Sequence, residues 1–527
     1  MKKFRETIKK LQRMDSTRPL MENNNSDIQG GHEFERHTRP NMSINGQSSR
    51  ELLPLCSGEA SDDEHGSSDR SEPNSVQSND HSTQTSEPLS FPDPPADLDQ
   101  HLDQHLKTIE EIVENELKKL SHSMSEEDRT HLKKHFHCET CTHLNNLLQN
   151  ISTSKNCSLL MTWVLQRKDL LDNPDLELLD EWETKAQTKL LKRVQEEVSD
   201  SLEKILKVDQ SQTCHNDEAY VQLYVDLIQC IDAMPKLAQN ISTILFYRVQ
   251  EVCFQELLKS VKRYTSEQAE ILHKKTQTWR EKPEMIHFLK TLRTCKELRQ
   301  HVKTNGNAIK PVLLKEIKGT LENMEAKTLQ LLKKVVTELA ETSLKDYFKL
   351  TSGVCAFFPL HTSCKRECDL FAALKTYFPK LSYASDEQRI VMDEVYKVVA
   401  HSYLKHLIQQ SKHKLTKHWS PDVGQAVWDD ANQLHTTISD LAPGVQQWNG
   451  MLQKIQEVLD CKSIDTLKLI IAGMQKDFEK QSEDLKLLPN LVQWKGLSKR
   501  EVREVLEALP DNPPIPSSGS LFSCCCG

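Results

Sequence analysis

Glycine is absent between Gly66 and Gly306, and only three prolines, Pro174, Pro235 and Pro283, occur between Ala96 and Lys310. A β-sheet needs a tight turn every few residues, and such turns favour glycine or proline. The absence therefore argues against a β domain and favours long helices. A strongly alternating apolar and polar run, which would indicate a strand, is also missing.

Long apolar runs are lacking as well. No stretch approaches the ~18–20 continuous apolar residues that span a bilayer. The charged N-terminus is followed by polar sequence rather than by the apolar core of a secretory signal. The 15 cysteines show no framework of a small secreted domain, so most are expected to be free thiols. We therefore expect a cytoplasmic protein.

The motifs of common enzymes are not found either. The sequence has no phosphate-binding G-x-x-x-x-G-K-[ST] loop, no G-x-S-x-G elbow and no H-E-x-x-H zinc motif. We expect no catalytic residue, no cofactor and no metal. The formal net charge of -9 gives no reason to expect nucleic acid as a partner.

The composition divides the chain into four segments. Residues 1–13 are basic and amphipathic. Residues 14–97 are rich in Ser, Asn, Asp, Glu and Pro, with Phe34 and Phe91 as their only aromatic residues, which predicts a disordered region. Residues 98–512 are predicted to be helical, with a possible sub-boundary near 265–310. Residues 513–527 are predicted to form a flexible, cysteine-rich tail.

Apolar residues repeat every three or four positions from residue 98 onward, which predicts one apolar face on a helix. The sequence predicts an all-α fold, an elongated rod of stacked helical bundles that follows the disordered N-terminal region. Capping boxes are expected at Ser385 with Gln388 and at Ser498 with Glu501. The first stripe is Leu98, Leu102, Leu106, Ile109, Val113, Leu117 and Leu120. Further helices are predicted over residues 159–170, 176–206, 220–261 with a break at Pro235, 312–347, 386–419, 425–440, 445–459, 463–487 and 498–509.

Three stretches carry a resemblance to a known family. They are Tyr220-Val221-Gln222-Leu223-Tyr224 through Pro235 to Cys253-Phe254-Gln255-Glu256-Leu257, residues 374–407 with Asp386-Glu387-Gln388-Arg389-Ile390, and Leu491-Val492-Gln493-Trp494-Lys495-Gly496-Leu497-Ser498-Lys499-Arg500-Glu501. Their order and spacing resemble the exocyst Sec-six family, within it the M-Sec and exocyst-component-3-like branch. Trp494-Lys495-Gly496 departs from the Arg-Gly-Asp-like spacing usual in the family.

This resemblance spans about residues 98–512 and implies a function. It implies a non-enzymatic tether or adaptor in exocytosis, located peripherally at the plasma membrane or on vesicles. The implied partners are exocyst subunits, SNARE proteins, a Ral-type small GTPase and anionic phosphoinositide membranes. The alternative is a cytosolic coiled-coil scaffold with no membrane role.

The two ends of the chain hold candidate membrane contacts. Basic residues flank Phe4, Ile8 and Leu11 near the N-terminus, and such a helix can lie on an anionic membrane; a solvated, frayed terminus is the alternative. Clustered cysteines near the C-terminus can be S-acylated or can stay unmodified. The basic residues are Lys2, Lys3, Arg5, Lys9, Lys10 and Arg13, and the cysteines are Cys524, Cys525 and Cys526.

Two further groups of residues have a functional and a structural interpretation. Late basic residues can bind lipid headgroups or an acidic partner, or they can form an ordinary polar helix face. Cys138 and Cys141 with nearby histidines resemble zinc ligands, but no second ligand pair is evident and a helical core face is favoured. The basic residues are Lys412, Lys414 and Lys417 near Trp419, and Lys495, Lys499, Arg500 and Arg503. The histidines are His135, His137 and His143.

Overall fold

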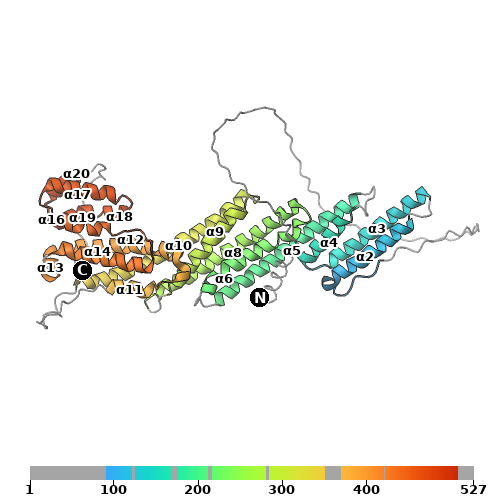
Figure 1. Ribbon diagram of the computed structural model, residues 1–527, viewed down its shortest axis with the longest axis horizontal. Coiled ribbons are helices and arrows are strands. Elements are labelled where there is room, and N and C mark those ends of the chain that lie inside the picture. Colours follow the sequence, from blue (N-terminus) through green and yellow to red (C-terminus); the bar gives the residue numbers. More distant parts are fainter. Residues whose placement is uncertain are drawn as a thin grey trace, which may run out of the picture. The chain divides into compact units, whose positions relative to one another are not determined.

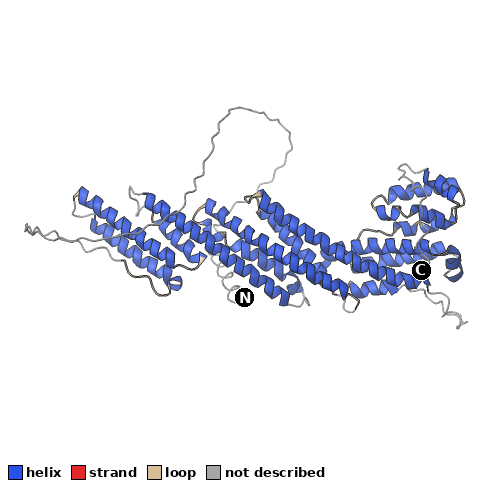
Figure 2. Cartoon of the chain, turned by 180° about the vertical axis from the view of Figure 1, so that it is seen from behind, coloured by secondary structure: helices blue, strands red, loops and turns tan. Residues whose placement is uncertain are grey.

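The computed structural model describes residues 91–120, 125–168, 176–211, 217–280, 284–349, 369–419 and 422–507. Every described residue belongs to one compact unit, which begins at Phe91. Within these ranges all regular secondary structure is helical and no strand occurs (Figure 2). The prediction of an all-α fold is confirmed.

The first half of this unit contains the longest helices. Three of them, α5, α8 and α10, each exceed 30 residues. The helices are α2 (Leu98–Leu120), α3 (Glu126–Asn150), α4 (Ser154–Gln166), α5 (Leu176–Ser211), α6 (Asp217–Ala233), α7 (Lys236–Gln239), α8 (Thr243–Gln277), α9 (Ile286–Asn305) and α10 (Pro311–Lys349).

The second half is made of shorter helices. They are α11 (Asp369–Tyr377), the 3-10 helix η3 (Ser382–Ala384), α12 (Ser385–Gln409), α13 (Lys412–His418), α14 (Val423–Leu441), α15 (Gly450–Gln453), α16 (Ile455–Asp460), α17 (Ile464–Asp477), α18 (Ser482–Leu485), α19 (Leu488–Lys495) and α20 (Lys499–Glu507).

The α2 helix shows how the apolar stripe becomes a packed face. Leu102, Leu106, Ile109 and Val113 are each at most 3% exposed, whereas Glu111 on the other face is exposed. Burial of each such side chain stabilises the fold by roughly 1.5–3 kcal/mol relative to exposure. The stripe read from the sequence is therefore the core-facing side of α2.

The helices of this unit pack on one another in series. In the first half, α2 packs on α4, α3 and α4 pack on α5, and α5 packs on α8 (Figure 1). The series continues from α8 and α9 to α10, from α10 to α12, and from α12 to α14 and α19. This arrangement confirms the predicted stack of helical bundles, because each bundle shares a long helix with the next.

The long helices α5, α8 and α10 run side by side in the same direction. Gln187 of α5 contacts Arg248 of α8 at 2.7 Å, and Glu203 of α5 contacts Arg263 of α8 at 3.4 Å. The two contacts follow the same order along both helices, so the helices are parallel. Lys262 of α8 pairs with Glu316 of α10 at 2.5 Å. Just after the end of α8, Trp279 Nε1 donates to Glu338 of α10 at 3.2 Å. Side-chain contacts therefore link the three helices along much of their length.

A buried carboxylate joins α6, α9 and α12. Glu387, at the start of α12, is 1% exposed. Its Oε1 lies 3.2 Å from both Arg293 Nη1 and Lys296 Nζ of α9. The hydroxyl of Tyr220 on α6 donates to its Oε2 at 3.2 Å. Burial and this carboxylate raise the pKa of Tyr220. Two of the stretches that carry the family resemblance meet at this point.

A second buried carboxylate joins α10, α12 and α14. Asp430 of α14 is 4% exposed, and its Oδ2 accepts hydrogen bonds from Tyr347 of α10 at 2.6 Å and Tyr403 of α12 at 2.5 Å. Phe348 and Trp419 stack beside the two tyrosines, with 5.0 Å between their own ring centroids. The aromatic cluster excludes water from the carboxylate and fixes the three helices together.

Four α-helices were not predicted from the sequence: α3, α9, α11 and α19. The α9 pattern is obscured because its buried face includes Lys290, Thr291 and Thr294 beside leucines. The possible sub-boundary near 265–310 spans the end of α8, the segment after it and α9, and both helices pack on α10.

Several predicted helices are shorter than expected. The predicted 386–419 helix is interrupted where Gln410 is extended, between α12 and α13. Residues 445–449 are not helical, because the Gln446 amide donates to Asp393 Oδ1 at 3.0 Å instead. The predicted 463–487 helix divides into α17 and α18. The helix ends therefore follow contacts with distant residues, which periodicity does not reveal.

The capping box predicted at Ser385 and Gln388 is wrong. Ala384, not Ser385, is the N-cap of α12 and makes no side-chain cap. The Gln388 amide instead accepts a hydrogen bond from the Leu381 amide at 2.9 Å and donates to the Pro379 carbonyl at 3.0 Å. Gln388 thus fixes the loop before the helix rather than the end of the helix.

Residues 91–97, which were predicted within the disordered region, have defined contacts. The ring of Phe91 stacks on His143 of α3 with 5.0 Å between centroids, and His143 Nε2 lies 3.3 Å from His105 Nε2 of α2. The remainder of the segment 14–97 lies outside the described residues. The structured part thus begins at least seven residues before α2.

Acidification is expected to destabilise the packing of residues 91–97 and α2 against α3. Burial first, and then the neighbouring His105, lower the pKa of His143 to about 4, although Asp93 opposes the shift; burial also lowers the pKa of His105. Between about pH 6.5 and 4 the unfolded histidines bind protons and the packed ones do not, so stability falls as pH falls through this window.

Hydrogen exchange of residues 91–150 measures this effect. We expect faster exchange at about pH 5 than at about pH 7 after correction for the intrinsic rate. The variant His143→Gln removes the group with the larger shift, so most of the pH dependence should disappear. Equal protection at both pH values in the unsubstituted chain would contradict the prediction.

Candidate functional site

The C-terminal end of the described chain is built from α19 and α20. Gly496 ends α19 in the left-handed region, with φ +113°, a conformation that favours glycine. Ser498 then caps α20: its Oγ accepts from the Glu501 amide at 3.3 Å, and Glu501 Oε2 accepts from the Ser498 amide at 2.8 Å. The capping box predicted at this position is confirmed, and it orients the basic residues that follow.

Three of the four predicted basic residues are exposed on α20: Lys499, Arg500 and Arg503. Among the described residues none of them has an ion-pair partner within 4.0 Å. Val505 on the opposite side of the helix is buried, and Lys468 of α17 pairs with Glu504 at 2.9 Å. Packing therefore holds α20 in place while its three cations, the α20 basic face, stay open to solvent.

Lys495 does not belong to that open surface. Its ammonium donates to the backbone carbonyls of Leu459 and Cys461 at 3.0 and 2.6 Å, at the C-terminal end of α16. A cation there satisfies carbonyls that lack a helical partner. Burial lowers the pKa of Lys495. The structure thus separates Lys495 from the patch predicted from the sequence and gives it a structural contact.

The second predicted basic group lies beside the first. Lys412 of α13 donates to the Lys495 carbonyl at 3.4 Å, and Trp494 Nε1 donates to the Gln410 carbonyl at 2.8 Å. Lys414 and Lys417 of α13 are exposed. Periodicity and composition do not indicate that residues more than 80 positions apart come together here. Both basic groups are therefore on neighbouring helices.

The candidate zinc ligands diverge on α3. Cys138 is exposed and Cys141 is buried, with the Cys141 thiol 3.8 Å from His137 Nε2. His135 is exposed, and His143 faces His105 and Phe91. Burial raises the pKa of Cys141 to about 11, which disfavours the thiolate that binds zinc. No group of three or more potential ligands able to hold a metal ion occurs among the described residues.

The other buried cysteines have the character of small apolar side chains. Cys157 and Cys230 are at most 1% exposed. Burial raises the pKa of Cys157 to about 11 and that of Cys230 to about 12. Since the thiolate is the reactive form, these thiols are unreactive near neutral pH.

The remaining predicted sites cannot be located. Lys2, Lys3, Arg5, Lys9, Lys10, Arg13, Cys524, Cys525 and Cys526 lie outside the described residues. Within the part of the chain that is described, no helix combines the length and apolarity needed to cross a membrane.

The structure defines an all-α protein made of serially packed helical bundles. Such a fold occurs in the crystal structure of M-Sec, which matches this chain with a TM-score of 0.55 and 15% sequence identity, over 82% of this chain and 76% of the M-Sec chain. No family model and no curated protein sequence matches this chain. The resemblance read from the sequence is thus confirmed as an M-Sec-like, exocyst-like fold.

Proposed function

We propose that this chain is a non-enzymatic adaptor that tethers vesicles to the exocytic machinery. The observation that carries the proposal is the M-Sec-like fold over 82% of the chain. A series of bundles joined by shared long helices holds binding surfaces at fixed separations, which is the mechanical requirement of a tether.

The proposal assigns different partners to different parts of the chain. The α20 basic face presents three exposed cations that form no ion pair within 4.0 Å among the described residues, which suits an acidic surface on an exocyst subunit, a SNARE protein or a Ral-type GTPase. The basic segment 1–13 and the cysteines 524–526 suit an anionic, phosphoinositide-containing membrane. Two weak contacts on one chain strengthen each other through effective concentration, so the protein is placed peripherally at the plasma membrane or on vesicles.

A bridging assay tests the proposal. Immobilised exocyst complex should retain fluorescent anionic vesicles when the full chain is present. Replacing Lys499, Arg500 and Arg503 with glutamine should lower capture of the chain by the exocyst roughly tenfold. Replacing the basic residues of segment 1–13 with glutamine and Cys524, Cys525 and Cys526 with serine should abolish vesicle retention and preserve capture.

Control substitutions and the alternative function determine how the result of the bridging assay is interpreted. Lys462, Lys476 and Lys480 are exposed lysines of the same C-terminal region but lie outside α20, and their replacement by glutamine should change neither readout. If the exocyst captures the chain but vesicles are never retained, the chain is a scaffold without a membrane role. If neither binds, the tethering proposal fails.

A further inference from the structure

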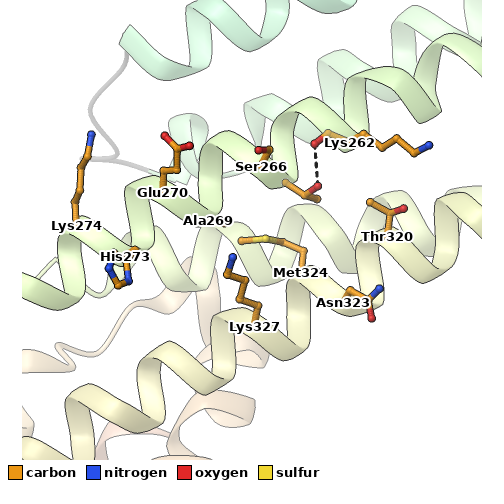
Figure 3. A pocket seen from close by; sticks show the side chains of 11 residues that line it. Lys262, Ser266, Ala269, Glu270, His273, Lys274, Thr320, Asn323, Met324 and Lys327 are labelled. Atoms are coloured by element: carbon orange, nitrogen blue, oxygen red, sulfur yellow. Dashed lines mark hydrogen bonds between the residues drawn. The ribbon is translucent and has the colours of Figure 1, made fainter.

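A groove of about 700 Å³ runs between α8 and α10. Buried Ala269 and Met324 form its floor. Figure 3 shows Met324 and Lys327 extending from α10 toward α8, whereas the side chains of Glu270 and Lys274, which also line the groove, extend from α8 on the side away from α10. The volume is within the range of small-molecule binding sites, about 300–1,000 Å³.

The groove has more positive than negative side chains. Three lysines, Lys262, Lys274 and Lys327, line it together with His273, and Glu270 is the one carboxylate among the lining residues. Lys262 pairs with Glu316 of α10. Among the described residues, neither Lys274 nor Lys327 has a carboxylate within 4.0 Å.

Nearby carboxylates are engaged by other cations. Glu322 and Glu325 of α10 both pair with Arg299 of α9, at 3.6 and 3.1 Å. Glu267 of α8 pairs with Arg263 at 2.8 Å. Since these acids already have partners, Glu270 is the carboxylate left to balance Lys274 and Lys327, and among the described residues it lies within 4.0 Å of neither ammonium.

Two other crevices of this unit contain lysines that are paired with carboxylates. In a crevice of about 710 Å³ between α8, α9 and α11, Lys275 pairs with Glu284 and Lys290 with Asp209. In a crevice of about 390 Å³ beside α12 and α18, Lys333 and Lys397 share Glu394 at 2.6 and 2.7 Å. These four lysines are neutralised within the fold, whereas Lys274 and Lys327 in the groove between α8 and α10 have no carboxylate within 4.0 Å among the described residues.

The polar groups of the groove suit phosphate oxygens. Ser266 and Asn323 line it with side chains that have no hydrogen-bond partner among the described residues. Thr265 and Thr320 donate their hydroxyls to the Lys262 and Glu316 carbonyls, at 3.1 and 2.8 Å, so their oxygens remain acceptors. Lysine ammoniums bind phosphate as point charges, and the remaining hydroxyl, amide and imidazole groups can donate to its oxygens.

We propose that this groove binds a compact polyanion with several phosphate groups, of the inositol polyphosphate type. One such group reaches Lys327 and His273 between the helices, and a second reaches Lys274 at the rim. The same chemistry occurs in a free inositol phosphate and in a phosphoinositide headgroup. The site lies on the described helices and is separate from segment 1–13, so it does not depend on the tethering proposal.

Titration calorimetry with inositol hexakisphosphate tests the site. The full-length chain should carry glutamine at Lys2, Lys3, Arg5, Lys9, Lys10 and Arg13, because that segment would bind the same polyanion. Adding Lys274→Gln and Lys327→Gln should raise the Kd about tenfold or more. The variant Glu270→Gln should lower the Kd about threefold, since it removes the carboxylate one helical turn before Lys274.

Lys315→Gln is the matched control, because Lys315 is exposed on α10 but does not line the groove. Its effect on the Kd should be small. No binding, or an equal loss with Lys315→Gln, would overturn the proposal, as would preference for an acidic peptide over the phosphate ligand. Vesicles with and without phosphatidylinositol bisphosphate identify the source: binding to them through Lys274 and Lys327 indicates the headgroup, whereas binding of the free ligand alone indicates the soluble molecule.

Discussion

Replacing Glu387 with alanine is expected to destabilise the folded chain by about 3 kcal/mol. The carboxylate is 1% exposed and contacts Arg293, Lys296 and the Tyr220 hydroxyl. Its removal takes the shared partner from all three groups, and leaves Arg293 with Glu297 at 3.3 Å, Lys296 with Asp386 at 4.0 Å and the Tyr220 hydroxyl with the Leu289 carbonyl at 3.2 Å. The loss should appear as a lower urea midpoint, followed by far-ultraviolet circular dichroism.

Asp386→Ala is the control for this experiment. Asp386 is the preceding residue of the same helix, but its side chain is 58% exposed and lies 4.0 Å from Lys296. An exposed pair contributes about 0–1 kcal/mol, so the control should lose little stability. Hydrogen exchange should also rise at α6, α9 and the start of α12 in the Glu387 variant. If Glu387→Ala unfolds at the same midpoint as Asp386→Ala, the carboxylate does not hold these helices together.

Replacing Asp430 with alanine is the second change expected to have a large effect, about 3 kcal/mol. The buried hydroxyls of Tyr347 and Tyr403 would both lose their acceptor. Hydrogen bonds to a charged acceptor contribute about 1.5–3 kcal/mol each, and a donor left unsatisfied in the interior adds its desolvation cost. The free energy of unfolding of the full chain measures the loss.

A compensated variant separates the hydrogen bonds from the packing. In the chain that carries Tyr347→Phe and Tyr403→Phe, both donors are already absent. Adding Asp430→Ala to it should cost much less than in the unsubstituted chain, so a double-mutant cycle should show strong coupling. Additive effects would contradict the assignment of these bonds.

The sequence was sufficient where local patterns decide the structure. The α2 stripe and the capping box of Ser498 and Glu501 involve residues at most four positions apart, so periodicity and residue type predict them. The order of the three resembling stretches also predicted the M-Sec-like fold, which the solved M-Sec structure supports.

Predictions failed where residues distant in sequence compete for the same polar group. Gln388 matches a capping box, but Leu381 and Pro379 in the preceding loop satisfy its amide. Lys495 looks like part of an exposed basic run, yet carbonyls of Leu459 and Cys461, more than 30 residues earlier, hold its ammonium. The sequence does not single out the groove lysines either. Lys274 follows Glu270 by four residues, which is the spacing of an ordinary ion pair on a helix surface.

The parallel run of α5, α8 and α10 determines how the molecule would respond to force. Tension applied between α2 and α14 cannot open these helices one contact at a time, because they lie alongside one another and must slide as a whole. Such sliding breaks many apolar contacts and several ion pairs at once, which gives high resistance to extension. If the chain acts as the tether proposed above, it would thereby transmit load between its two partners without lengthening.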